Sequence, residues 1–157
     1  MKAVLQRVVS AAVKIDGDCV GKIEKGILLL LGVDEGDTNQ ECDFLAQKAV
    51  TLRIFEDENG KMNKSLCDIG GEMLVVSQFT LCADCKNGRR PSCIHAALPP
   101  VAESLYRRFT ARVNEAGIKT ANGRFGADML VTINNDGPVT IVLDTKEIMP
   151  QKNVLGA

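Results

Sequence analysis

An uninterrupted apolar run from Ile27 to Val33 is the feature that most constrains how this chain can fold. Gly26 and Asp34 bound the run, and its length suits a strand but is short for a helix. Because polar residues do not alternate with apolar ones along it, neither face of such a strand can lie in water. We therefore predict a strand that is buried on both faces.

Other segments carry strand signals of their own. Residues 2–15 alternate loosely and are rich in Val and Ile, and Asp16-Gly17-Asp18 suits a tight turn into a second strand over 19–23. Apolar residues are also dense in later parts of the chain. There we predict strands over residues 51–55, 72–81, 129–133 and 139–143.

Two segments have helical spacing. Thr38 is followed three residues later by Glu41, which is the form of a capping box, and predicts a helix over 39–52. A second helix is expected to begin behind Pro99-Pro100 and to end at Gly117. Strands outnumber helices and rarely alternate with them. We therefore predict an α+β fold: a mostly antiparallel, curved and barrel-like sheet with two covering helices.

Length and composition are those of one globular domain. A chain of 157 residues that is 45% hydrophobic and 25% charged can bury a single core, and neither disorder nor a membrane span is expected. Lys2 and Arg7 place charge inside what would have to be the apolar part of a signal peptide. We expect a cytoplasmic protein.

The six cysteines are interpreted as reduced thiols, because the core is large enough to need no disulfide framework. Four residues nevertheless have the ligand types of a zinc site: Cys82, Cys85, Cys93 and His95. Their spacing is shorter than is usual for a zinc finger, and no second Cys-x-x-Cys pair occurs. We predict no metal and no other cofactor, and keep a zinc protein as an alternative.

The inventory of catalytic side chains is short. His95 is the only histidine and no Gly-x-Ser-x-Gly sequence occurs, so a serine–histidine triad is not expected. Thr80 can be considered as a nucleophile, yet the sequence identifies no base for it, and its hydroxyl could instead orient a ligand. What remains is catalysis by the main chain. Peptide N–H groups of Phe79 and Thr80 can stabilise an oxyanion without any ionisable side chain.

Two segments, Ser77-Gln78-Phe79-Thr80-Leu81 and Asn135-Asp136-Gly137-Pro138-Val139-Thr140, together resemble the signature motifs of the D-aminoacyl-tRNA deacylases. Further landmarks of that family follow in the right order: Arg53 to Asp57, Gly60 to Asn63, Gly88 to Ser92 and Phe125 to Met129. The resemblance covers a domain of residues 1–145 and leaves 146–157 as an unmatched tail. The chain departs from the family at Cys82 and Cys93, where relatives commonly have an aromatic residue.

The resemblance implies a proofreading hydrolase that cleaves the ester bond between tRNA and a D-amino acid. The main chain of Phe79 and Thr80 would supply the oxyanion donors, and Ser77 and Gln78 would bind the substrate. Catalysis in this family looks RNA-assisted, so the 2′-hydroxyl of the terminal ribose can take the place of a catalytic side chain. That agrees with the short inventory of catalytic groups.

Gly137-Pro138 carries the expected selection between D- and L-amino acids. A trans bond is the ordinary expectation for X-Pro, but in the resembling deacylases this dipeptide is cis. There it enters the active site of the other subunit of a homodimer and points its carbonyls at the α-carbon of the substrate. An L-residue would place its Cβ against them, whereas a D-residue or glycine would pass. The resemblance thus implies a homodimer that acts on D-aminoacyl-tRNA and on glycyl-tRNA mischarged on tRNA(Ala).

Contacts with tRNA are expected to be local, since a net charge of −1 provides no broad basic face. The one dense basic stretch contains Lys86, Arg89 and Arg90, which can meet phosphates or can be a solvated loop. Phe125 and Met129 match family positions that contact the terminal adenine, although by periodicity alone both suit a core.

Two further alternatives stay open. In some relatives the Gly-Pro bond resembles trans, and the enzyme removes L-alanine from the wrong tRNA. A nucleic-acid-binding module without catalytic activity would keep the same fold. Release of the amino acid from D-Tyr-tRNA distinguishes the enzyme from the module.

Overall fold

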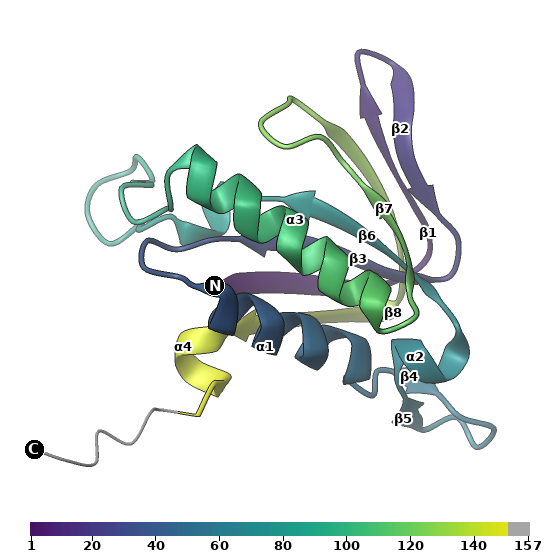
Figure 1. The fold of residues 1–157 in the computed structure, drawn as a ribbon. Helices are drawn as coiled ribbons and strands as arrows, with labels where there is room; N and C mark the ends of the chain where they lie inside the picture. The colour runs from purple at the N-terminus through teal and green to yellow at the C-terminus, as the bar shows by residue number, and fades with distance from the viewer. Residues whose placement is uncertain (151–157) are drawn as a thin grey trace, which may run out of the picture.

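The computed structural model describes residues 1–150, which form a curved six-stranded sheet with two long helices on one face and a separate small two-stranded sheet (Figure 1). The sheet consists of β1 (Lys2–Ile15), β2 (Asp18–Ile23), β3 (Gly26–Gly32), β6 (Glu72–Ser77), β7 (Lys119–Asn122) and β8 (Leu130–Asp144). Its order is β2-β1-β3-β6-β7, with β8 on the other edge of β1. Pairing is antiparallel around β1 and parallel from β3 to β7. The predicted α+β class is confirmed.

The predicted hairpin and buried strand are both present. Asp16 and Gly17 have positive φ angles of 49° and 85°, which a two-residue turn between β1 and β2 requires. β3 lies between β1 and β6, and only Leu30 of its residues is not fully buried. Its apolar character therefore reflects cover on both faces of the sheet.

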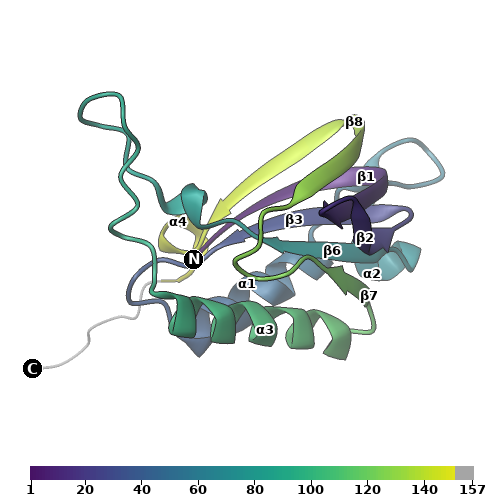
Figure 2. The ribbon, with the colours of Figure 1, turned by 90° about the horizontal axis from the view of Figure 1, so that it is seen from above.

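The two long helices, α1 (Asn39–Thr51) and α3 (Pro99–Glu115), lie side by side across one face of the sheet (Figure 1, Figure 2). Thr38 caps α1 with both hydrogen bonds of the predicted capping box. Pro99 occupies the start of α3, where a helix needs no donor from it. Apolar side chains of both helices, among them Leu45 and Phe109, join the sheet in the main core.

A second, smaller core fills the other side of the sheet, where the sheet curls until β2 approaches β7. Its buried residues are Val8, Ala11, Val13, Ile23, Leu28, Leu74 and Val76. Gly21 of β2 permits the approach, since a Cβ at this position would collide with the main-chain oxygen of Asn122. The sheet is therefore barrel-like, as predicted.

Two predicted strand boundaries are wrong. The strand predicted over 51–55 is reduced to β4 (Phe55–Glu56), because α1 continues through Thr51. The strand predicted over 72–81 ends at Ser77, and Phe79–Cys82 form a short 3₁₀ helix, η1. There the chain turns back onto β3, and a Cβ on Gly32 would lie only 3.0 Å from Cβ of Leu81.

The strands predicted over 129–133 and 139–143 are two parts of one strand, β8, because both pair with β1 in the same direction. Neither the short strands β5 (Met62–Lys64) and β7 nor the one-turn helices α2 (Leu66–Ile69) and α4 (Thr145–Ile148) were predicted from the sequence. Residues 151–157, most of the predicted tail, lie outside the described residues. No helix within residues 1–150 is long and apolar enough to cross a membrane.

Candidate active site

The first motif lies where β6 ends and η1 begins. Gln78 N donates to the main-chain oxygen of Leu31 at 2.8 Å, which ties the motif to β3. Phe79 is 62% exposed, and Thr80 is exposed beside it. The main-chain N–H groups of Phe79 and Thr80 have no acceptor within residues 1–150, as is usual for the first turn of a helix. The motif therefore presents two adjacent free donors at an exposed point.

The side chain of Thr80 has no base beside it. Its hydroxyl accepts a hydrogen bond from the amide of Gln78, and no ionisable group bonds to it among the described residues. His95, the only histidine, is exposed in the segment before α3. The arrangement offers main-chain donors and no nucleophile–base pair.

The second motif forms a bulge in β8. Between two successive pairs of β1 with β8, only Arg7 lies on β1, whereas Asp136 to Val139 lie on β8. The additional residues project from the strand, and the Gly137-Pro138 peptide bond among them is cis. Asn135 closes the base of the bulge, because its Nδ2 donates to the main-chain oxygens of Arg7 at 3.2 Å and Val139 at 3.0 Å.

Arg7 supports this bulge, although the sequence did not predict it as a site residue. Its side chain is 9% exposed. Nε donates to the main-chain oxygen of Asp136 at 3.1 Å, and Nη1 donates to that of Ile54 at 2.9 Å. Gly137 has a φ of 127°, and a Cβ on it would lie 3.0 Å from Arg7 Nη2. A charged residue on the buried face of an apolar strand was the signal that could have revealed it.

The two motifs do not meet within one chain. Arg7 lies opposite Ile27 of β3, whereas Ser77 lies opposite Leu31, four residues further along that strand. Standard strand dimensions then separate the bulge and η1 by about 13 Å along the strands and about 14 Å across the sheet. At a combined distance of roughly 20 Å, they cannot both touch one ester group in a single chain.

Phe125 and Met129 lie in different surroundings. Phe125 packs against Tyr106 of α3, with ring centroids 5.9 Å apart, and lines an open pocket of about 340 Å³. The Tyr106 hydroxyl donates to the main-chain oxygen of Val75 in β6, so this pocket adjoins the strand that leads to the first motif. Met129 is half-buried against the smaller core.

The basic residues Lys86, Arg89 and Arg90 are exposed on the segment between η1 and α3, which projects from the body of the molecule (Figure 2). Two backbone hydrogen bonds of 2.7 and 2.9 Å between Asp84 and Ser92 close the loop at its base. None of the three cations forms an ion pair within residues 1–150. Their charges therefore face solvent.

The four zinc-type residues do not gather into a ligand set. No three His, Cys, Asp or Glu side chains in the part of the chain that the structure describes are placed to hold a metal ion. Cys85 and His95 are exposed, whereas Cys82 is buried. Burial, together with the Asp34 carboxylate beside it, raises the pKa of the Cys82 thiol to about 12.

Residues 4–144 match the family described as D-Tyr-tRNA(Tyr) deacylase. The chain is 58% identical over 146 residues to a D-aminoacyl-tRNA deacylase of Desulfatibacillum aliphaticivorans, with 93% of this chain and 100% of the relative covered. It is 52% identical over 148 residues to a D-aminoacyl-tRNA deacylase of Thermosipho africanus, with 94% and 99% covered.

Two solved structures resemble the fold. The c-Myc DNA unwinding element binding protein has a TM-score of 0.86 at 41% identity, covering 92% of this chain and 98% of that one. A probable eukaryotic D-amino acid tRNA deacylase has a TM-score of 0.77 at 17% identity, covering 90% and 97%. At the lower identity the likeness concerns the fold alone.

Proposed function

Because this chain belongs to the D-Tyr-tRNA deacylase family and hydrolyses D-aminoacyl-tRNA, we propose that two copies build each active site. One copy supplies η1, and the other supplies the bulge that contains Gly137-Pro138. The observation that carries this proposal is the separation of the two motifs, roughly 20 Å within one chain by strand spacings. Each copy then holds two half-sites.

The edge of β8 supports assembly into a homodimer. Within residues 1–150, β8 pairs with β1 alone, and its other edge has no strand partner. Leu130 and Val142 on this strand are 68% and 72% exposed. An unpaired edge strand with exposed apolar side chains is a surface on which a second copy can pair. The bulge projects from this same strand, so pairing there would bring it toward the neighbouring copy.

The proposed chemistry is hydrolysis with main-chain stabilisation of charge. Water attacks the ester carbonyl, and the N–H groups of Phe79 and Thr80 stabilise the oxyanion that forms. The intermediate then breaks its bond to the ribose oxygen, which takes up the proton released by the water. The 2′-hydroxyl of the substrate relays this proton, because within residues 1–150 no side-chain base bonds to Thr80. Ser77 and Gln78 position the aminoacyl group.

Selection for D-amino acids is proposed to come from the bulge. Arg7 fixes the main chain there, so the carbonyls of Gly137 and Pro138 form a rigid barrier beside the substrate's α-carbon. The Cβ of an L-residue would collide with that barrier, whereas a D-residue points its side chain away. Glycine has no Cβ, so glycyl-tRNA(Ala) is a second proposed substrate.

The remaining site residues are proposed to hold the acceptor end of tRNA. Lys86, Arg89 and Arg90 would contact phosphates from their projecting loop, which suits a chain without a broad basic face. Phe125 would stack against the terminal adenine beside its open pocket, with Met129 supporting it. We assign the reaction to the cytoplasm, where aminoacyl-tRNA is consumed.

Hydrolysis of matched D- and L-esters tests the proposal. Trace enzyme should release the amino acid from D-Tyr-tRNA, D-Asp-tRNA and Gly-tRNA(Ala), while L-Tyr-tRNA and L-Ala-tRNA survive. Comparable D and L rates would refute the barrier, and rapid release of L-alanine would favour the relaxed-chirality alternative. Gly137→Ala, which introduces a Cβ at the barrier itself, is the matched variant and should lose D-Tyr-tRNA hydrolysis.

A further inference from the structure

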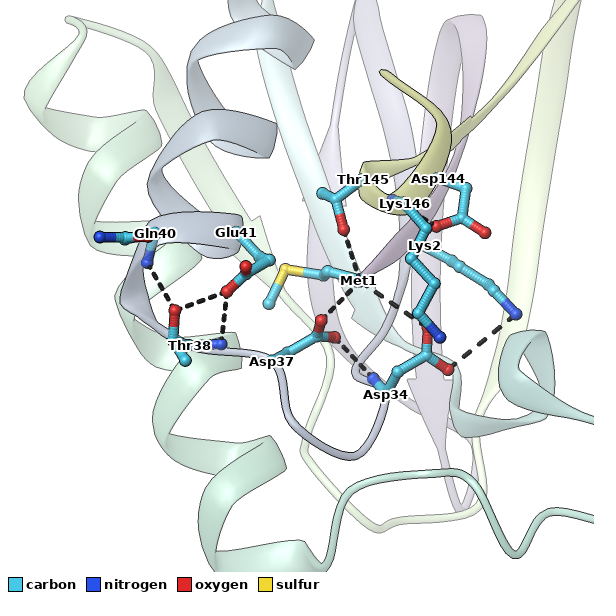
Figure 3. Close-up of polar contacts among 10 residues, drawn as sticks. All are labelled: Met1, Lys2, Asp34, Asp37, Thr38, Gln40, Glu41, Asp144, Thr145 and Lys146. Carbon is cyan, nitrogen blue, oxygen red and sulfur yellow. Dashed lines mark hydrogen bonds and ion pairs between the residues drawn. The ribbon is translucent and has the colours of Figure 1, made fainter. Parts of the chain in front are cut away.

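The α-amino group of Met1 is buried where three segments of the fold meet (Figure 3). Its nitrogen donates to Asp37 Oδ1 at 2.8 Å and to Thr145 Oγ1 at 2.8 Å, and lies 3.8 Å from Asp34 Oδ2. Asp34 and Asp37 belong to the turn between β3 and α1, and Thr145 begins α4. One ammonium group therefore joins the start of β1, this turn and the end of β8.

The same cluster reaches the candidate active site. The Asp34 side chain is 4% exposed and follows the end of β3, where a Cβ on Gly32 would lie 3.2 Å from Sγ of Cys82, the last residue of η1. Burial acts to raise the pKa of Asp34, but the Cys82 thiol and the positive charges of Lys2, the N-terminus and Lys146 outweigh it and lower that pKa. The element that carries Phe79 and Thr80 thus packs on the end of β3 that leads into Asp34, a carboxylate that the terminal ammonium helps to keep charged.

The pKa of Asp37 shifts in the opposite direction from that of Asp34. Burial raises its pKa despite the opposing hydrogen bond and charge of the N-terminus. Its Oδ2 also accepts from Asp34 N at 2.7 Å, so one carboxylate binds both the ammonium and the turn that holds Asp34. Removal of the ammonium charge would leave the buried Asp37 without its cation and Asp34 with only Lys2 and Lys146, which is unfavourable.

An acyl group on this nitrogen is incompatible with these contacts. Formylation or acetylation turns an ammonium with three donors and a charge into a neutral amide with one donor. That amide cannot serve Asp37, Thr145 and Asp34 together. Met1 is 0% exposed, so the added atoms also have no free space. A peptide extension before Met1 would have the same two effects.

We propose that a free α-amino group at Met1 is a positioning group for η1, and that acylation or extension at this nitrogen disables the enzyme. A chain begun with formylmethionine would have to be deformylated first, by hydrolysis of the formamide to formate and the free amine. The activity readout of this inference rests on the proposed function. The burial of the amine does not, and it can be measured separately.

Chemical labelling tests the burial. Exposed α-amines have a pKa of about 7.7–8.0 against about 10.4 for lysine, so near neutral pH an acylating reagent such as acetic anhydride modifies them first. In the folded protein we expect the Met1 amine to react more slowly than exposed Lys86, and in guanidinium chloride to become the fastest site. Peptide mapping by mass spectrometry gives both rates. Rapid labelling of Met1 in the folded protein would overturn the inference.

Paired variants test the positioning role. A Gly-Ser-Gly extension before Met1 should lower the thermal unfolding midpoint and reduce kcat on D-Tyr-tRNA by about tenfold, with a smaller change in KM. Asp37→Asn should cause a similar loss, and its combination with the extension should add little, because both break the same contact. Asp68→Asn is the matched control, because Asp68 caps the short helix α2 and makes no contact with the Met1 cluster within residues 1–150. Its carboxylate accepts from Ser65 N at 2.8 Å and does not bond the amine, so its effect should add in full.

The outcomes distinguish the positioning role of the Met1 amine from the proposed function. Full additivity of Asp37→Asn with the extension, or an unchanged kcat in the extended protein, would overturn the positioning role. A formyl group or additional residues on Met1 of the protein purified from its own cells would overturn it as well. Protection of the amine with non-additive unfolding midpoints would support the inference even if D-Tyr-tRNA were not a substrate, a result that would count against the proposed function alone.

Discussion

The strands β1 and β8 pair along most of their length, yet they contribute unequally to the core. Buried residues recur along β1, and its two edges are covered by β8 on one side and by β3 and β2 on the other. β8 contains one fully buried residue, Leu143, and pairs with β1 alone within residues 1–150. Similar apolar sequences therefore serve different ends. Those of β1 stabilise this chain, whereas Leu130 and Val142 of β8 are exposed and would pack against the proposed second copy.

Complementation between two inactive variants should give the largest effect. Phe79→Arg obstructs η1 and Gly137→Arg destroys the bulge, so each variant alone should lose about 100-fold or more in kcat/KM. A heterodimer has one site with both lesions and one with neither. After subunit exchange of a 1:1 mixture, about a quarter of the D-Tyr-tRNA hydrolysis should return.

The controls for that experiment are the two variants incubated separately, with exchange verified by mass spectrometry of differently tagged copies. If exchange is complete and no activity returns, the bulge of β8 does not complete a neighbouring active site. The exposure of β8 would then have no role in catalysis.

A second pair of variants compares the two strands directly. Leu5 of β1 is 0% exposed, so Leu5→Ala should lower the free energy of unfolding by about 2–5 kcal/mol through the cavity that it leaves. Val142→Asp on β8 should change the stability of the isolated monomer by no more than about 0.5 kcal/mol, but should dissociate the dimer. Urea unfolding and sedimentation measure the two quantities. A dimeric Val142→Asp protein would contradict the role given to β8.

The two buried thiols, Cys42 and Cys82, should make the stability of the fold sensitive to alkali. Burial raises the pKa of Cys42 and Cys82 from 9.0 to about 12. Both thiols hold their proton more tightly in the folded chain than in the unfolded chain. Their contribution to the free energy of unfolding is therefore fully present below pH 9 and is lost as the pH rises toward 12. Between pH 9 and pH 10 the free energy of unfolding should fall by about 1 kcal/mol for each thiol.

Urea unfolding at both pH values measures this change, and the Cys42→Ala/Cys82→Ala protein is its control. The control should show a smaller decline, and an equal decline in both proteins would assign the alkaline loss to other groups.

The smallest effect is expected at Thr80. Thr80→Ala removes the hydroxyl but keeps the peptide N–H, so kcat/KM for D-Tyr-tRNA should fall by less than about tenfold. Single-turnover hydrolysis would measure it, with tRNA binding and circular dichroism as controls. Abolished turnover in a folded variant that still binds tRNA would restore Thr80 as the nucleophile.

Local signals predicted the parts of the fold that depend on neighbours in sequence. Asp16-Gly17 set the first hairpin, and Thr38 with Glu41 set the start of α1, because the groups that bond there lie within a few residues. The end of β6 was not predictable in this way. Its turn into η1 depends on packing against Gly32, which is remote in sequence.

In the candidate site, too, the features that depend on residues remote in sequence could not be predicted. Its two motifs could be found as short sequences, but their separation follows from the register of β1, β3, β6 and β8, which no single segment encodes. Arg7 was missed because the group that it supports, the main-chain oxygen of Asp136, lies 129 residues away. The burial of the Met1 amine likewise depends on Thr145, which lies at the other end of the domain.

The close approach of Gly21 to Asn122 leaves the barrel with a seam. Within residues 1–150, no backbone hydrogen bond joins β2 to β7, so only packing of the smaller core holds the curled sheet together along this line. Amide protons on the facing edges of these strands should therefore exchange with solvent sooner than those of β3, which is bonded on both sides. We expect the sheet to open locally by separation of β2 from β7, while the strands that carry η1 and the bulge stay paired.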